Sequence, residues 1–221
     1  MAQTPAEVVA FVDRHLPNEL FFSLAARVRS ENVLLDPRST LDRLFGARSM
    51  IPSADLPAHL EEAFQRFARY AGFRTVEDLI DRATLYPYYR MFMSSDRWAD
   101  VLARARGDDA GGLKTRMGLV AQRFGASPRL RSCRQCSSDA MRLGGPYWHT
   151  FHQLPGVQVC AIHGIALGEL SQQSRSSNRH ELVLAPDNLA PQKIPVRWIP
   201  ALHAFARLSR SALDCGSKPP E

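Results

Sequence analysis

The chain has 221 residues, of which 45% are hydrophobic and 23% are charged, and its formal net charge at pH 7 is +6. These values are ordinary for a globular protein, and they exclude a disordered chain, a collagen-like fibre and a disulfide-dense mini-protein. At about 100–200 residues per domain, the length predicts one large domain or two small ones.

The first 110 residues are predicted to form a helical domain that opens with a pair of helices. Asn18 precedes apolar residues that recur at helical spacing, so we expect it to cap the first helix. Residues 36–37, Asp-Pro, interrupt the pattern. Ser39 or Thr40 is then expected to cap a short second helix over residues 41–45. Two helices joined by a tight break resemble a helix-turn-helix, although any helical domain contains such pairs.

Three more helices are expected before the domain ends. One spans residues 60–70, one begins after a capping-box-like Thr75, and one covers residues 98–105. The aromatic segment at 85–92 is expected to close the core of this domain. The glycine-rich stretch at 107–112 (GDDAGG) then predicts a loop and a domain boundary.

The basic surplus of the chain is concentrated in residues 113–145, which hold seven basic side chains and one acidic side chain. Such a patch is typical of proteins that bind a phosphate backbone, and the alternative is an arginine-rich solvated surface. A basic helix is expected over residues 114–124. The side chains that we expect to contact nucleic acid are Lys114, Arg116, Arg123, Arg129, Arg131 and Arg134.

The last part of the chain is predicted to be a short extension. Residues 172–179 are polar and indicate a linker, and residues 196–213 could form one more helix. From Cys215 onward we expect disorder. The predicted division is therefore a helical domain over residues 1–110, a basic helix with a metal module over 111–170, and a linker with a tail over 171–221.

The strongest local signal is Cys133-x-x-Cys136, followed after 23 residues by Cys160-x-x-His163. Two thiolates three residues apart grip one side of a metal ion, and a second pair brought back by a loop completes a tetrahedron. Three sulfurs and one imidazole form a usual ligand set for one structural Zn²⁺, and they leave no position for substrate. The sequence therefore predicts a mainly α-helical protein with a small Cys3His zinc-finger module.

Other readings of these residues stay open at this point. Cys133 and Cys136 could form a redox pair, although that motif is expected after a strand in a βαβ unit. The cysteines could also be buried without a ligand. His149 or His152 could replace His163 as the fourth ligand, with the remaining histidines packing around the site. The remaining cysteine, at position 215, is expected to be an exposed free thiol.

The chain has no pattern for export, membrane insertion or common catalysis. Its first residues lack the basic and apolar regions of a signal peptide, and the longest stretch without a charged residue, 143–168, contains glycine, proline and histidine. Phosphate-binding loops, nucleophile elbows and zinc-protease motifs are missing. We therefore expect a cytoplasmic protein that is not an enzyme and has no membrane partner.

The run from Cys133 to Gly164 resembles the zinc segment of the TniQ family, with its Cys-x-x-Cys, Tyr-Trp, His-Gln-Leu-Pro-Gly and closing Cys-x-x-His-Gly. Residues 17–20 are similar to the opening Pro-x-Glu-Leu of that family, and residues 79–93 to its Thr-Leu-x-Pro-x-Tyr segment. Ala83 and Ala161 depart from the usual His and Pro, but neither change removes a ligand.

The resemblance implies a target-selection adaptor in DNA transposition, similar to the N-terminal part of TnsD-type proteins. Such an adaptor links target DNA or a target-bound complex to an AAA+ ATPase, and it is not itself the transposase. The implied partners are this ATPase, double-stranded DNA, a CRISPR effector complex in RNA-guided members, and a second copy of the chain. The sequence ends about 50 residues after the metal module, so we do not expect it to recognise an attachment site alone.

Two other functions compete with the adaptor. The first is a zinc-dependent DNA-binding regulator that reads sequence with the N-terminal helix pair, and it would bind a specific site without partners. The second is a thiol redox enzyme, which would be metal-free and would hold a cysteine of low pKa.

Overall fold

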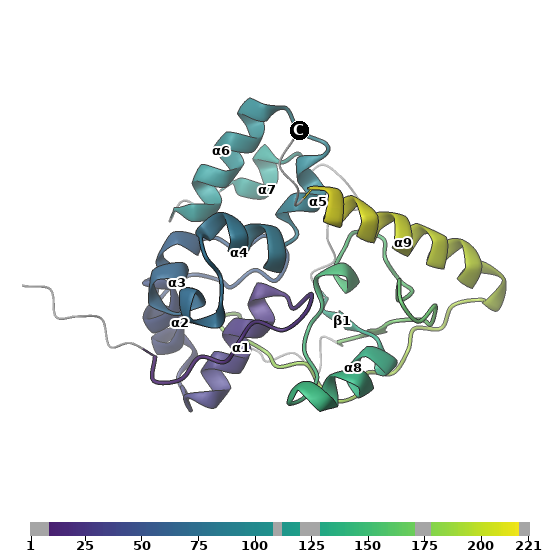
Figure 1. The fold of residues 1–221 in the computed structure, drawn as a ribbon, viewed down its shortest axis with the longest axis horizontal. Coiled ribbons are helices and arrows are strands. Elements are labelled where there is room, and N and C mark those ends of the chain that lie inside the picture. Colours follow the sequence, from purple (N-terminus) through teal and green to yellow (C-terminus); the bar gives the residue numbers. More distant parts are fainter. Residues whose placement is uncertain (1–8, 108–111, 120–128, 171–177, 217–221) are drawn as a thin grey trace, which may run out of the picture.

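The computed structural model describes residues 9–107, 112–119, 129–170 and 178–216, and the predicted mainly helical fold is confirmed (Figure 1). Within these ranges the α-helices are α1 (Phe21–Glu31), α2 (Pro37–Phe45), α3 (Leu60–Arg66), α4 (Val76–Ala83), α5 (Tyr86–Arg90), α6 (Ser95–Arg106), α7 (Leu113–Arg116), α8 (Arg134–Ala140) and α9 (Ile199–Gly216). Four 3-10 helices are η1 (Ala68–Ala71), η2 (Met141–Leu143), η3 (Thr150–His152) and η4 (Val196–Trp198). Two short antiparallel strands, β1 (Arg131–Ser132) and β2 (Gly168–Glu169), pair with Arg131 opposite Glu169.

The first helix of the predicted pair forms as α1, but the expected cap is wrong. Leu20 is the N-cap residue of α1 and makes no side-chain capping bond. Asn18 lies in the left-handed region with φ 58°, and its carbonyl accepts a hydrogen bond from Thr150 N at 2.9 Å. A contact made 132 residues away therefore determines the conformation of Asn18, in place of the local capping bond.

The second helix begins earlier than predicted. Asp36 caps α2 by accepting a hydrogen bond from Ser39 N at 2.7 Å, and Pro37 occupies the first turn. Proline suits this position because the first amides of a helix have no partner within it. The Asp-Pro dipeptide thus starts α2 and does not merely break the chain, so capping by Ser39 or Thr40 is wrong.

The later elements follow the prediction with three differences. Thr75 caps α4 as expected, accepting from Asp78 N at 3.1 Å. The helix predicted over residues 60–70 divides at Phe67, whose φ of −147° separates α3 from η1.

The aromatic segment at 85–92 forms the unpredicted helix α5, and its last two residues, Met91 and Phe92, are exposed instead of closing the core. The basic helix predicted over residues 114–124 ends at Arg116 in α7, and Gly118 follows with φ 73°. Residues 120–124 of that predicted helix lie outside the described residues.

The buried apolar residues form one continuous cluster that includes side chains from the N-terminal helices, the segment around the cysteines and α9. Trp148 lies where the first two of these meet and is fully buried. Its backbone N donates to Ser23 Oγ at 3.1 Å, its carbonyl accepts from Leu20 N at 2.7 Å, and its Nε1 donates to Val183 O at 2.8 Å. The cysteine-bearing module is therefore anchored directly on α1.

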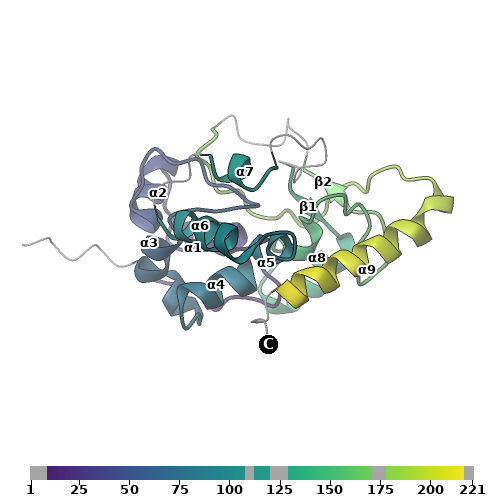
Figure 2. The same ribbon diagram turned by 90° about the horizontal axis from the view of Figure 1, so that it is seen from above.

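Helix α9 extends from the cysteine-bearing module to α5, as both ribbon views show (Figures 1 and 2). The helix predicted over residues 196–213 thus forms, and it continues to Gly216. Cys215 is exposed but belongs to this helix, so the expected disorder from that residue onward is wrong for positions 215 and 216. Among the residues that the structure describes, none of the helices is both long and apolar enough to traverse a lipid bilayer.

Candidate metal centre

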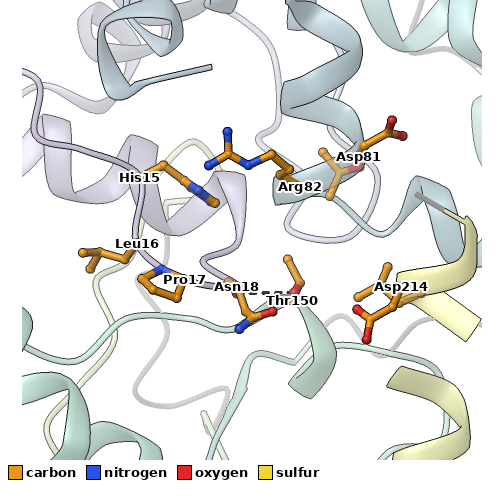
Figure 3. A pocket seen from close by; sticks show the side chains of 10 residues that line it. His15, Leu16, Pro17, Asn18, Asp81, Arg82, Thr150 and Asp214 are labelled. Carbon is orange, nitrogen blue, oxygen red and sulfur yellow. Dashed lines mark hydrogen bonds between the residues drawn. The ribbon is translucent and has the colours of Figure 1, made fainter. Parts of the chain in front are cut away.

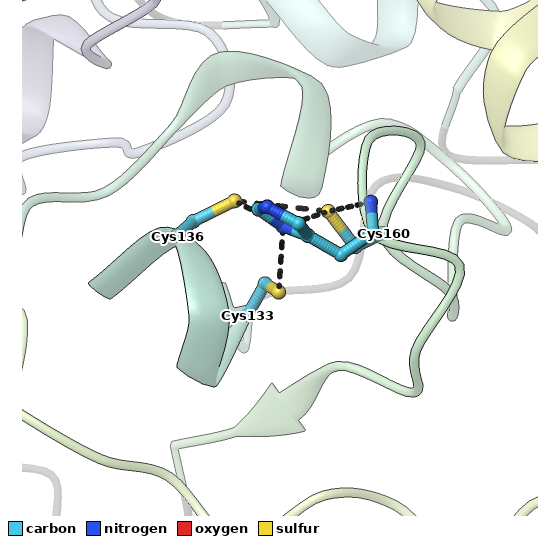
Figure 4. Close-up of side chains that lie close together, drawn as sticks. Cys133, Cys136 and Cys160 are labelled. Atoms are coloured by element: carbon cyan, nitrogen blue, oxygen red, sulfur yellow. Dashed lines mark hydrogen bonds between the residues drawn. The ribbon is translucent and has the colours of Figure 1, made fainter. Parts of the chain in front are cut away.

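The four residues of the predicted zinc motif come from two short turns that face each other (Figure 4). Cys133 follows β1 and is the N-cap residue of α8, which places Cys136 on the first turn of that helix. The second turn is closed by hydrogen bonds from Cys160 N to Ile165 O at 2.8 Å and from Gly164 N to Cys160 O at 2.9 Å. This turn brings His163 over the three sulfur atoms.

Four distances between the donor atoms match the edges of a tetrahedral metal site, and all four atoms lie within 4.8 Å of one another. His163 Nδ1 lies 3.5 Å from Cys133 Sγ, 3.3 Å from Cys136 Sγ and 3.6 Å from Cys160 Sγ. The sulfur atoms of Cys136 and Cys160 are 3.7 Å apart. With Zn–S bonds of about 2.3 Å and Zn–N bonds of about 2.0 Å, the edges of a tetrahedron are about 3.5 to 3.8 Å. In the described part of the chain, this is the group of side chains that could hold a metal ion.

The three thiols interact directly with one another. Hydrogen bonds from Cys136 and Cys160 lower the pKa of Cys133, and the hydrogen bond to Cys133 raises the pKa of Cys136. The pKa of Cys160 is raised for the same reason. A divalent cation would stabilise all three as thiolates, and its binding would release protons.

The geometry separates His163 from the other two candidate ligands. His152 Nε2 lies 3.8 Å from Cys136 Sγ, and His149 Nδ1 lies 3.2 Å from the carbonyl of Tyr147. Burial lowers the pKa of His149 to about 4 and that of His152 well below its usual value, so both rings are neutral at pH 7. Of the three histidines, His163 is the one within 3.6 Å of all three sulfurs, which favours it as the fourth donor of a bound metal ion.

One feature of the structure agrees with a redox pair at Cys133 and Cys136, but the arrangement around the two cysteines does not. Cys133 does follow a strand and precede a helix, which the sequence had not indicated. However, β1 pairs with β2 in an antiparallel ladder, so it does not belong to a βαβ unit. A third thiol and an imidazole complete the cluster, and Cys133, Cys136 and Cys160 are all free of disulfides. These four side chains form a group that could hold a metal ion.

A carboxylate lies behind the histidine. Asp139 Oδ2 is 3.3 Å from His163 Nε2, and Asp139 Oδ1 accepts a hydrogen bond from Gln135 Nε2 at 3.2 Å. Metal-ligating histidines usually donate their second ring nitrogen to such a group, which fixes the tautomer and the orientation of the ring. Asp139 therefore positions His163 with Nδ1 toward the sulfurs.

Replacing Asp139 with asparagine is expected to weaken Zn²⁺ binding about tenfold while the fold is kept, because the loss of such a partner costs 10–100-fold in affinity and this one is exposed. Competition with a chromogenic chelator of known zinc affinity measures the change. Gln135→Ala is the matched control, since it removes the neighbour of Asp139 on the same helix and leaves the contact with His163. Equal affinities for all three proteins would contradict the positioning role.

The loop with the sequence HQLPG, residues 152–156, encloses Arg131. The side chain of Gln153 accepts from Arg131 N at 3.0 Å and donates to Arg131 O at 2.8 Å, so it pairs with β1 as another strand would. The guanidinium of Arg131 donates to the carbonyls of Leu154 and Val157. Burial lowers the pKa of Arg131 to about 10, which leaves it charged at pH 7. Arg131 is 4% exposed, so its guanidinium is engaged inside the protein.

The other basic residues expected at a nucleic-acid surface are separated by the fold. Arg134 is exposed on α8, and Arg123 lies outside the described residues. Three others are half-exposed and form ion pairs with acidic side chains that lie far away in the sequence or in other elements: Lys114–Asp55 at 2.7 Å, Arg116–Asp100 at 3.2 Å and Arg129–Glu169 at 3.2 Å. The local surplus of charge counted along the sequence is therefore partly neutralised in the fold.

A polar cavity of about 470 Å³ lies between the N-terminal segment, α4, η3 and the end of α9 (Figure 3). Asp81, Arg82 and Asp214 are among its lining residues. Burial raises the pKa of Asp81 to about 6, whereas Arg82 is held by Asp78 Oδ2 at 3.1 Å. These residues do not make a metal-binding group with their neighbours, so the Cys3His cluster is the site that the structure defines best.

Comparison with known proteins agrees with this site. The model of the TniQ family matches residues 10–167, a range that contains all four residues of the cluster. The transposon Tn7 transposition protein TnsD of Escherichia coli is 28% identical over 148 residues. This alignment covers 66% of the present chain but 29% of TnsD, so the chain spans under a third of the length of that relative. Helix α9 lies beyond the residues that the family model matches.

Proposed function

Because the chain belongs to the TniQ family, we propose that it is a target-selection adaptor in DNA transposition. It would link target DNA, or a complex already bound to the target, to an AAA+ ATPase that regulates the transposase. In an RNA-guided element the target-bound partner would be a CRISPR effector complex, and two copies of the chain could act together. The family match over residues 10–167 carries this proposal, and the similarity to a Tn7 transposition protein supports it.

We further propose that Cys133, Cys136, Cys160 and His163 bind one structural Zn²⁺ ion. Three sulfurs and one nitrogen at these distances suit zinc, and the protein would fill all four coordination positions. A closed site has no place for a substrate or an activated water molecule. The ion would therefore hold the fold and would not catalyse a reaction, which suits a non-enzymatic adaptor.

The surroundings of the site explain how a structural ion would serve an adaptor. Segment 147–150, which lies within the metal module, pairs with segment 17–20 at the start of α1 through hydrogen bonds from Leu20 N to Trp148 O and from Thr150 N to Asn18 O. An ion at the cluster would hold the loop between the two turns against the helical domain. Surfaces of both parts could then contact partners in a fixed relative orientation.

For the nucleic-acid contact we propose the exposed side chains among the predicted set, with Arg129 and Arg134 nearest to the metal module. The pair Arg129–Glu169 spans 3.2 Å at the surface, and such exposed pairs contribute little to stability. A phosphate could therefore replace the carboxylate at small cost. Because Arg131 is buried, we leave it out of this surface.

The decisive experiment is co-purification of the zinc-loaded chain with the AAA+ ATPase encoded beside it, on double-stranded DNA with ATP. We expect a ternary complex with about one zinc ion per chain, read by size-exclusion with light scattering and by metal analysis. Arg129→Glu with Arg134→Glu should weaken the DNA-dependent step and reduce its salt dependence. Zinc-loaded protein that ignores the ATPase but binds one DNA sequence would overturn the adaptor in favour of a DNA-binding regulator.

A further inference from the structure

Helix α9 has an apolar face on its outer side. Trp198, just before the helix, is 56% exposed, and Phe205 and Leu208 are 42% and 71% exposed. Together with Ala201, Ala212 and Cys215 these residues follow one another at alternating intervals of three and four positions. This is the spacing of the contact seam in a coiled coil, and it brings all six to one side of a helix. We call them the α9 seam.

The opposite side of α9 is fixed to the rest of the protein. His203 Nε2 lies 3.2 Å from the carbonyl of Ala161 in the metal module, and the guanidinium of Arg210 lies 4.9 Å from the ring centre of Phe151. At the far end, Arg90 donates to the carbonyl of Gly216 at 3.4 Å. The helix is therefore held at both ends, which orders the α9 seam before any partner binds and reduces the entropic cost of binding.

A close approach of backbones requires glycine at position 216 of α9. A Cβ atom built at Gly216 would collide with the carbonyl of Pro87 in α5, so only glycine allows this contact. At the other side of the metal module, the ring of Phe205 lies against Gly156, where a Cβ would come within 3.2 Å of the ring. Phe205 therefore packs against Gly156 with one part of its ring and belongs to the α9 seam with the other. Leu208 contributes to the exposed surface.

The charges around the α9 seam are mostly positive. The exposed charged side chains of α9 and the segment leading into it are three basic residues, Lys193, Arg197 and Arg207, and one acidic residue, Asp214. Arg210 lies on the opposite side, against Phe151, and does not belong to this rim. A rim of one sign favours a partner of the opposite sign, because complementary charges steer encounter and exclude competitors.

We propose that the α9 seam docks an amphipathic helix with acidic flanks from a partner protein. The apolar side chains of that helix would pack between Trp198, Phe205 and Leu208, and its carboxylates would face Arg197 and Arg207. The small alanines at positions 201 and 212 would let the two helices approach closely. Because α9 lies beyond the residues matched by the family model, this interface is separate from the proposed zinc site and from the proposed adaptor activity.

The test uses the full, zinc-loaded chain and a fluorescein-labelled synthetic peptide of three heptads with Leu at positions a and d and Glu at positions e and g. Fluorescence anisotropy is expected to report saturable binding. Leu208→Glu should weaken it at least tenfold, because a hot-spot side chain in a small interface is lost and a like charge is introduced. Leu35→Glu is the matched control, since Leu35 is 80% exposed in another part of the protein. A peptide with Lys at positions e and g should bind at least tenfold more weakly.

Three results would overturn the proposal. Failure of the acidic peptide to bind, together with a dimer in sedimentation that Leu208→Glu dissociates, would show that the seam pairs with a second copy. Binding to anionic phosphatidylglycerol vesicles, lost in Leu208→Glu without any peptide binding, would assign the face to a membrane surface. Equal loss of peptide binding in Leu208→Glu and Leu35→Glu, or in neither, would show that the α9 seam is not the docking site. Circular dichroism of each variant verifies that α9 is folded.

Discussion

Replacing Cys133 with serine is expected to release the metal ion and to unfold the region from about residue 130 to residue 170. That region contains two strands of two residues each, a seven-residue helix and two 3-10 helices of three residues each, so little regular structure holds it without the ion. Binding of structural zinc supplies about 10 kcal/mol or more in isolated zinc-finger peptides. Metal analysis, thermal unfolding and amide hydrogen exchange over residues 130–170 measure the effect.

Cys215→Ser is the matched control for this prediction. It makes the same chemical change at an exposed cysteine of α9, outside the cluster. We expect it to keep one zinc ion per chain and an unchanged melting temperature. Full zinc occupancy and unchanged stability in Cys133→Ser would contradict the metal site, and an equal loss in both variants would indicate a general sensitivity to cysteine replacement.

Much of the candidate site could be predicted because its information is local. The Cys-x-x-Cys and Cys-x-x-His spacings each bring two donors onto one short turn, whatever the rest of the chain does. The Cys-x-x-His spacing favours His163 as the fourth ligand, but His149 and His152 are also near the cysteines in the sequence. The choice among the three histidines depends on distances to all three sulfurs, which the closing turn at Gly164 determines.

Arg131 illustrates where reasoning from the sequence fails. In the sequence it is one of several arginines in a basic stretch, and nothing next to it indicates burial. Its partners, the carbonyls of Leu154 and Val157, lie more than 20 residues away in a loop that forms around it. The one sequence feature that relates to the burial of Arg131 is Gln153 in the HQLPG motif. A glutamine in a turn-rich segment can pair with a strand edge, as Gln153 does with the backbone of Arg131.

The helices show the same distinction. The capping role of Thr75 was predicted correctly, because a capping bond joins residues three apart and the helix propensity of α4 agrees with it. The capping role of Asn18 was predicted wrongly, because the conformation of Asn18 depends on the distant Thr150. The helical conformation of residues 215 and 216 was also missed, and there Gly216 packs against the backbone of α5 where a Cβ would collide. Local signals thus predicted most of the longer helices, whereas the short helices α5 and α8 and the two strands were not predicted.

Replacing Glu19 with glutamine is expected to destabilise the protein by about 1.5–3 kcal/mol, because it removes the buried carboxylate that accepts two hydrogen bonds from Arg27. Arg27 keeps its contacts with Asp13 at 3.5 Å and Glu31 at 3.3 Å. Glu19 is fully buried, and its two carboxylate oxygens accept from Arg27 Nε at 2.9 Å and Arg27 Nη2 at 3.0 Å. Glu19 Oε2 also accepts from Leu16 N at 3.1 Å. The free energy of unfolding of the zinc-loaded protein in urea measures the loss.

Glu62→Gln is the control for this pair. Glu62 and Arg66 form an ion pair one turn apart on α3, where the glutamate side chain is 49% exposed. Such surface pairs contribute at most about 1 kcal/mol, so we expect a small effect. A loss in Glu19→Gln no larger than that in Glu62→Gln would show that the buried pair is not needed for stability.

A double-mutant cycle then distinguishes the cost of an orphaned charge from the value of the pair itself. Arg27→Met alone should also be strongly destabilising, because Glu19 would keep a buried carboxylate without its guanidinium. The combined Glu19→Gln and Arg27→Met variant should lose less than the sum of the two single changes, by about 1–3 kcal/mol. Glu19 also pairs through its backbone with His149 of the metal module. The Glu19–Arg27 pair could act mainly by holding residues 147–150 against Glu19. In that case the double variant will be more stable than either single variant but will still show faster amide hydrogen exchange at residues 147–150 than the unchanged protein.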